Sequence, residues 1–146
     1  NEDKHRDLHN FYRGLLHLYG KTPALYENDY DWSGFEWINC DDNYRSILSF
    51  VRKSKSGRGN LLFVCNFTPV AYEDFCVGVP FAGKYKEIFN SDSTEYGGTG
   101  FVNPRVKQSK KLRCDGRPNS LECKLAPLAI QIFSCTRTPQ KSSKKK

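Results

Sequence analysis

The density of apolar residues along the chain is highest at residues 61–67, which read Leu-Leu-Phe-Val-Cys-Asn-Phe and are followed by Thr68 and Pro69. A short apolar run that ends in turn residues is typical of a strand buried on both faces. A helix is disfavoured, because the run is short and Pro69 would end it. We therefore expect Leu62, Phe63 and Val64 to be buried at the centre of a sheet.

Shorter segments that predict strands lie on both sides of this central strand. They are residues 35–39, 44–52, 72–79, 83–90, 121–125 and 128–135. Turn residues such as Gly57 and Gly59 separate them, and no helical pattern intervenes, so neighbouring strands are expected to pair as antiparallel hairpins. The predicted fold class is all-β, an antiparallel β-sandwich whose two sheets pack through their apolar faces. We expect Trp37, inside the first strand, to lie in this core.

One amphipathic helix is predicted ahead of the strands, over residues 3–19. Its apolar side chains recur at helical spacing and form one stripe: Leu8, Phe11, Tyr12, Leu15, Leu16 and Tyr19. Asp3 is a candidate N-cap, and Gly20 followed by Pro23 predicts the end of the helix. No second helix is available to cover the stripe, so we expect the sandwich to cover it incompletely.

The connector between this helix and the first strand combines aromatic and acidic residues. Tyr26, Asp29, Tyr30, Asp31 and Trp32 follow one another without a regular period. Flat aromatic faces beside carboxylates are suited to binding a sugar, whose C–H face packs on a ring while its hydroxyls donate hydrogen bonds. The same residues suit a joint between domains, since amphipathic rings pack on one side and stay polar on the other. We favour the joint and keep these five residues as candidate sugar-binding residues.

The net charge of +7 does not predict a nucleic-acid-binding protein, because the excess charge is concentrated near the end of the chain. Removing the five cations of residues 137–146 leaves +2 for the remainder. That segment contains Pro, Gln, Ser and Lys but no aromatic residues, so we interpret it as a disordered basic tail. No apolar run approaches the roughly 18 residues of a membrane span. Neither nucleic acid nor a membrane is an expected partner.

The cysteines are interpreted as free thiols of a cytoplasmic protein. They are Cys40, Cys65, Cys76, Cys114, Cys123 and Cys135. Several lie among apolar strand residues, where free cysteine behaves as a small hydrophobic residue. No C-x-x-C pair supports a zinc site, and His5 and His9 share a helix face without the glutamate of a zinc-protease motif. We therefore expect no metal and no cofactor.

An ordered series of motifs resembles the C-terminal end of 1,4-alpha-glucan (glycogen) branching enzymes. The matching segments are residues 16–19, 23–25, 29–30, 34–38, 49–50, 64–70, 78–80, 90–93, 96–100, 116–121 and 127–129. Each motif is weak alone, but together they cover nearly everything before the basic tail. The chain lacks Met and starts at Asn1, so we interpret it as a fragment or a processed product.

The resemblance implies a domain organisation and a function. Residues 1–23 would be the last helix of a missing beta/alpha barrel, residues 24–136 the amylase-type C-terminal all-beta domain, and residues 137–146 the tail. The family moves alpha-1,4-glucan segments onto 6-hydroxyl groups in glycogen biosynthesis, a retaining reaction that needs two carboxylates roughly 5 Å apart. In the family these carboxylates lie on the barrel, so no catalytic residue is assigned here.

The resemblance also fixes the expected partners and the alternatives. The implied partners are an alpha-glucan chain and the missing catalytic barrel, and the fragment alone is expected to be inactive. A free-standing carbohydrate-binding module is the main alternative, although such a module has no use for an uncovered apolar helix stripe. A basic nucleic-acid-binding β domain is the second alternative, and the near-neutral body of the chain disfavours it.

Overall fold

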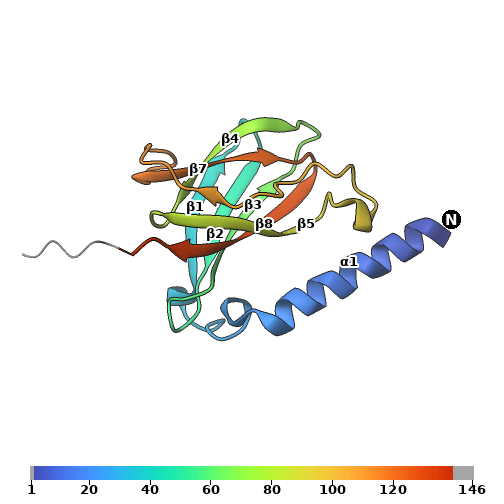
Figure 1. Ribbon diagram of the computed structural model, residues 1–146, viewed down its shortest axis with the longest axis horizontal. Coiled ribbons are helices and arrows are strands. Elements are labelled where there is room, and N and C mark those ends of the chain that lie inside the picture. Colours follow the sequence, from blue (N-terminus) through green and yellow to red (C-terminus); the bar gives the residue numbers. More distant parts are fainter. Residues whose placement is uncertain (1, 140–146) are drawn as a thin grey trace, which may run out of the picture.

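The computed structural model describes residues 2–139, which form one α-helix, eight strands and three short 3₁₀ helices (Figure 1). In chain order these are α1 (Glu2–Lys21), η1 (Pro23–Leu25), η2 (Trp32–Gly34), β1 (Phe35–Asp42), β2 (Ile47–Arg52), β3 (Asn60–Asn66), β4 (Tyr72–Val79), β5 (Gly83–Asn90), η3 (Thr94–Tyr96), β6 (Lys107–Gln108), β7 (Asn119–Leu125) and β8 (Ala129–Arg137). The expected all-β class with one preceding helix is confirmed.

The boundary of the basic tail differs slightly from the prediction. Arg137, assigned to the tail from sequence, is the last residue of β8, and the Thr138 amide donates to the Ala82 carbonyl at 3.0 Å. The chain therefore remains hydrogen-bonded two residues beyond the predicted boundary. The remainder of the predicted tail, residues 140–146, lies outside the described residues.

The strands form two antiparallel sheets of unequal size. The larger sheet has the order β1-β2-β3-β8-β5-β6, and the smaller sheet pairs β4 with β7. The central strand β3 pairs with β2 on one side and with β8 on the other, with Leu62 opposite Val51 and Phe133. The apolar run that organises the sequence therefore lies in the middle of the larger sheet.

The main core fills the space between the two sheets. The larger sheet contributes Val51, Leu62, Val64, Tyr85 and Phe133 among others, and the smaller sheet contributes Phe75, Val77, Val79, Leu121, Cys123 and Leu125. Side chains of a strand alternate between its faces, so every second residue of β3 enters this core. Leu62 and Val64 are fully buried, as expected.

A second apolar cluster lies on the other face of the larger sheet, where α1 covers part of it. Leu61, Phe89 and Ile132 of the sheet pack with Phe11 and Leu18 of the helix. The prediction that Phe63 is fully buried is wrong: it is half-buried at the margin of this cluster and stacks on Phe50, with ring centroids 4.7 Å apart. Phe63 is only partly covered because α1 lies over one part of this face.

Trp37 does not lie in the core, which corrects the expectation from sequence. It is 46% exposed, whereas its neighbour Ile38 is buried between the sheets. Trp37 points to the outer face of β1, which is an edge strand of the larger sheet. There it contacts Phe35 and Phe50, at centroid distances of 4.9 and 5.8 Å. Being inside a strand was not enough to bury it.

Helix α1 is longer than predicted at both ends. Asp3 lies inside the helix instead of capping it, and Gly20 lies in its last turn. The helix ends at Lys21, and Thr22 adopts an extended conformation ahead of Pro23. A residue before proline is disfavoured in the helical conformation, so Pro23 accounts for this end better than Gly20 does.

The contact between α1 and the sandwich is made largely by η3. The ring of Tyr96 lies 5.7 Å from that of Phe11 and 5.4 Å from that of Phe89. Asp92 fixes the loop that carries η3, because its carboxylate accepts hydrogen bonds from the backbone amides of Thr99 and Phe101. Figure 1 shows α1 outside the two sheets, below this loop.

Candidate functional site

The connector of residues 22–34 is built from two short 3₁₀ helices that a single arginine ties to the larger sheet. Arg52, at the end of β2, donates hydrogen bonds to the backbone carbonyls of Ala24 and Leu25, both at 3.3 Å. The same guanidinium forms an ion pair with Asp29 at 2.7 Å. The side chain of Arg52 therefore fixes the connector at Ala24 and Leu25 and again at Asp29.

The second half of the connector is shaped by Asp31 and Gly34. Asp31 caps η2, since its carboxylate accepts from the Ser33 amide at 2.7 Å. Hydrogen bonds from the backbone and side chain of Ser33 lower the pKa of Asp31, so this carboxyl is ionised at neutral pH. A Cβ on Gly34 would lie 2.0 Å from the Asn28 carbonyl oxygen, so only glycine allows the chain to fold back here.

These turns place two aromatic side chains in solvent above an open hollow of about 380 Å³. Tyr30 is fully exposed and Trp32 is 89% exposed. The hollow is lined by Asp29, Tyr30, Asp31, Trp32, Phe35 and Arg52. Aromatic rings of this size are usually covered, and their exposure marks a surface that is available for contact.

The structure brings four of the five candidate glucan-binding residues together and separates the fifth. Asp29, Tyr30, Asp31 and Trp32 share the hollow, whereas Tyr26 packs beside Tyr19 of α1 at a centroid distance of 5.8 Å. Tyr26 therefore belongs to the joint between helix and connector. Both carboxylates already hold the backbone, Asp29 through Arg52 and Asp31 through Ser33.

Two residues of the hollow were not found by sequence reasoning. Phe35 was assigned to the first strand, and Arg52 was read only as the end of the second. Arg52 is 23 residues from its partner Asp29, so no local pattern could connect them. The sequence did contain one signal for Arg52: it is a cation at the end of a mostly apolar strand. A cation that is partly buried needs a partner of opposite charge.

Phe35 also joins the hollow to a row of rings on the outer face of the larger sheet. The row runs from Trp37 and Phe35 on β1 to Phe50 on β2 and Phe63 on β3. Cross-strand pairing explains it, because Trp37 lies opposite Phe50 and Phe50 lies opposite Phe63. We call these four residues the aromatic row.

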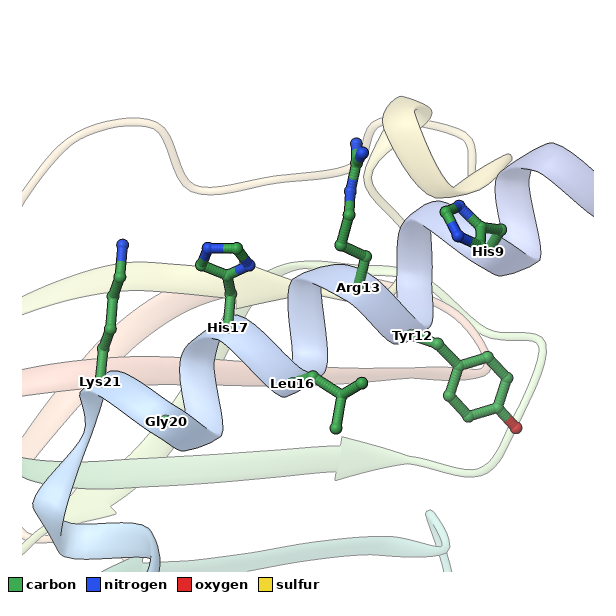
Figure 2. A pocket seen from close by; sticks show the side chains of 7 residues that line it. All are labelled: His9, Tyr12, Arg13, Leu16, His17, Gly20 and Lys21. Carbon is green, nitrogen blue, oxygen red and sulfur yellow. The ribbon is translucent and has the colours of Figure 1, made fainter.

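A second exposed surface is the outward face of α1. Tyr12 and Leu16 border an open hollow of about 540 Å³, together with Arg13, His17 and Lys21. Figure 2 shows Tyr12 and Leu16 pointing to one side of the helix, while the two cations and His17 point to another. Leu16 is 70% exposed. The expectation that the apolar stripe is incompletely covered is confirmed.

The described part of the chain contains neither a cluster of metal-ligating side chains nor a membrane-spanning helix. Within residues 2–139, His, Cys, Asp and Glu side chains nowhere gather in the groups of three that could hold a metal ion. No helix of the same span is long and apolar enough to cross a membrane. The connector and the outward face of α1 remain the surfaces of interest.

Fold and surface together define this chain as an all-β sandwich domain with a flanking helix and exposed aromatic residues. Residues 37–136 match the alpha amylase C-terminal all-beta domain. The chain belongs to that family, which also confirms the predicted fold type.

The curated relatives agree with the resemblance stated from the sequence. A 1,4-alpha-glucan branching enzyme of Clostridium perfringens strain SM101 is 47% identical over 131 residues, which are 90% of this chain and 19% of the relative. The enzyme of the same name from Synechococcus elongatus is 42% identical over 141 residues, 97% of this chain and 18% of the relative. The enzyme of the same name from Synechocystis is 39% identical over 139 residues. The chain thus spans about a fifth of the length of these relatives.

Proposed function

We propose that this chain is the C-terminal all-β domain of a glycogen branching enzyme. The whole enzyme would transfer alpha-1,4-glucan segments to form alpha-1,6 branches, and this part would support that reaction without performing it. The observation that carries the proposal is the 47% identity to a 1,4-alpha-glucan branching enzyme over 131 residues. The proposed location is the cytoplasm, and the six free cysteines support it.

The outward face of α1 is the proposed contact with the catalytic barrel. Tyr12, Leu16 and Tyr19 are all at least half exposed on a helix whose other face packs on the sandwich. An apolar helix face needs a partner. Residues 1–23 would then be the last helix of the barrel, and the joint at Tyr26 would connect the two domains. A free-standing carbohydrate-binding module leaves this face unexplained.

The hollow beneath Trp32 is the proposed glucan contact. A glucose ring presents a C–H face that packs on Trp32 or Tyr30, and its hydroxyls can donate to the carboxylates of Asp29 and Asp31. In a wet, exposed site each contact contributes only about 0.5–1.5 kcal/mol. We therefore expect millimolar affinity for this chain alone, about 4 kcal/mol in total.

Calorimetric titration with maltoheptaose tests the glucan contact. Trp32→Ala should weaken binding severalfold, because Trp32 supplies the largest exposed ring of the hollow. Trp37→Ala is the matched control, since Trp37 is the other tryptophan of the chain, is half exposed and does not line the hollow. If both variants bind as the wild type does, the connector is only a joint between domains.

The proposed inactivity of this chain has its own test. The chain is incubated with amylose, and new alpha-1,6 linkages are counted after enzymatic debranching. We expect none, because no residue of the chain matches the paired catalytic carboxylates that the family resemblance places on the barrel. New branches would contradict the assignment of this chain to a supporting role.

A further inference from the structure

Two of the free cysteines meet where the turn of residues 114–117 packs on β4. The Cys114 thiol donates a hydrogen bond to the backbone carbonyl of Cys76, with sulfur and oxygen 3.3 Å apart. The two thiol groups also lie within hydrogen-bonding reach of each other. Both residues are partly exposed, whereas three of the other four cysteines are buried. The fold therefore brings together two thiols that are 38 positions apart in the chain and open to small reagents.

The turn lies on the face of β4 to which the Cys76 side chain belongs. Cys76 and Gly78 are two residues apart in a regularly paired part of β4, so their side-chain positions share one face. A Cβ on Gly78 would lie 2.6 Å from the Cys114 carbonyl oxygen, which shows that the turn covers this face closely. The Asp115 carboxylate fixes the approach, because it accepts a hydrogen bond from the Gly78 amide at 2.7 Å. The Cys76 side chain therefore projects toward the turn that carries Cys114.

The same turn also holds β1, the edge strand of the larger sheet. The second carboxylate oxygen of Asp115 accepts from the Asn39 side chain at 2.8 Å. Arg117 donates to the Trp37 carbonyl at 2.9 Å. Since β4 belongs to the smaller sheet, the turn connects the two sheets at one edge of the sandwich. A covalent bond between the turn and β4 would fix this connection.

We propose that Cys76 and Cys114 form a redox pair, which a peroxide converts into a disulfide that locks the turn of residues 114–117 onto β4. One thiol sulfur attacks a peroxide oxygen, the O–O bond breaks, and one water leaves behind a sulfenic acid. The second sulfur attacks the sulfenic sulfur, the S–O bond breaks, and the hydroxide takes the second thiol proton to leave as water. Two thiols and one hydrogen peroxide thus give one disulfide and two waters. The pair is independent of the proposed glucan contact.

The surroundings of Cys114 assign the order of attack. Burial is the largest cause that raises the pKa of Cys114, and hydrogen bonds with Cys76 and Asp115 raise it further. The Cys114 thiol is therefore protonated at neutral pH, and the thiolate is the reactive form. Cys76 attacks the peroxide, and Cys114 resolves the sulfenic acid. A partly exposed disulfide of this kind is open to reduction, so the lock is reversible.

Mass spectrometry of the full chain tests the proposal. The chain is fully reduced, freed of reductant, treated with a small excess of hydrogen peroxide and digested without reduction. We expect the intact mass to fall by two hydrogen atoms and one cross-linked peptide pair to contain Cys76 and Cys114. A gain of oxygen without a cross-link, a disulfide between two chains, or a cross-link through other cysteines overturns the pair. This readout uses the wild type, so it does not depend on the folding of any variant.

Thermal unfolding measures the lock. Oxidation should raise the Tm by about 5–10 °C, because the disulfide closes a long loop in the unfolded chain, and dithiothreitol should reverse the shift. Cys76→Ser and Cys114→Ser should each abolish the shift. Cys40→Ser is the matched control and should retain it, since Cys40 is the exposed cysteine of β1. An unchanged Tm of the oxidised wild type, or an equal shift in Cys114→Ser, overturns the lock.

Discussion

Burial controls the chemistry of the individual cysteine residues. Burial raises the pKa of Cys65 to about 11 and that of Cys123 and Cys135 to about 12, so these thiols stay protonated at neutral pH. Burial also raises the pKa of Cys114 to about 12, whereas Cys40 is exposed on β1. Because the thiolate is the reactive form, the six thiols should differ widely in reactivity.

Thiol titration with Ellman's reagent measures this difference. In the folded protein Cys40 should react first, and Cys40→Ser should remove the fastest phase. Under denaturing, non-reducing conditions all six cysteines should react, because all six are free in the structure. A denatured count of zero would show that the cysteines are paired in disulfides, and the cytoplasmic proposal would lose its support.

Glu36 on β1 forms ion pairs with two cations that come from different parts of the chain. It pairs with Lys53 from the β2–β3 loop and with Arg117, which also donates to the Trp37 carbonyl at 2.9 Å. Burial raises the pKa of Glu36, but the hydrogen bonds from Lys53 and Arg117 lower it by more. The pKa of Glu36 therefore lies below its ordinary value of 4.5. The folded state therefore favours the ionised carboxyl.

This shift predicts a pH dependence of stability with a definite sign. A carboxyl whose folded pKa is depressed stabilises the fold above its unfolded pKa, and this stabilisation is lost as the pH falls through the folded pKa. Glu36→Gln should therefore be less stable than wild type by about 1–2 kcal/mol at pH 6. The difference should shrink as the pH falls below 4.5.

Urea unfolding at several pH values between about 3 and 6 gives this difference directly. Glu122→Gln is a suitable control, because Glu122 pairs with Lys110 at 2.9 Å on the surface, where both side chains are about half exposed. Exposed pairs contribute little to stability. A constant difference between Glu36→Gln and wild type across this range would contradict the role of its charge.

At the scale of elements, the placement of α1 depends on a close approach at one glycine. A Cβ on Gly14 would lie 2.5 Å from the hydroxyl oxygen of Tyr96. The helix can therefore lie this close to η3 because residue 14 has no side chain. Nothing lies within 4 Å of the corresponding position on Gly20 of the same helix. The two glycines therefore have different roles.

Gly14→Leu should push α1 away from η3 and reduce stability by about 1–3 kcal/mol, the usual cost of overpacking. Gly20→Ala should instead be neutral or stabilising by up to about 1 kcal/mol, because alanine favours helix and has room. Denaturant unfolding compares the two, and near-ultraviolet circular dichroism reports the surroundings of Tyr96. Equal stability of Gly14→Leu and wild type would show that this contact does not place the helix.

The helix and most strands were predictable from the sequence. Which face of each strand is covered by another element was not. Alternation and turn residues located seven strands, including β3 with Leu62 and Val64 at its centre. The two-residue strand β6 left no periodic pattern. The burial of Phe63 and Trp37 was misjudged because both side chains lie on the outer face of the larger sheet, Phe63 at the margin of the cluster under α1 and Trp37 on the edge strand β1. At the candidate site, local composition identified Trp32, but only the folded chain brings Arg52 to Asp29.

At the scale of the whole molecule, one group of exposed apolar side chains lies along a single face of α1. Leu8, Tyr12, Leu16 and Tyr19 of α1 are each at least half exposed. An uncovered face of this kind favours association in water, since pairing two copies removes apolar surface from solvent. The expected self-association is therefore a property of this chain alone, which an attached partner domain would suppress.

Light scattering across a concentration series should show an average mass that rises with concentration. Leu16→Lys should reduce this rise, and removing residues 1–20 should reduce it further. Leu112→Lys is the matched control, because Leu112 is comparably exposed but lies in a loop of the sandwich. A mass that stays monomeric for wild type at all concentrations would contradict the prediction.

The pairing of β3 with β8 has a consequence for how the fold is reached. Leu62 lies opposite Phe133 and Asn60 opposite Cys135, so the middle of the larger sheet joins residues more than 70 positions apart. Contacts this distant in sequence slow folding, because a long loop must close before they form. Until β8 has been synthesised, β3 presents an unpaired apolar edge that can pair with other chains. The unpaired edge of β3 is therefore an aggregation hazard during synthesis, and it lasts until β8 pairs with it.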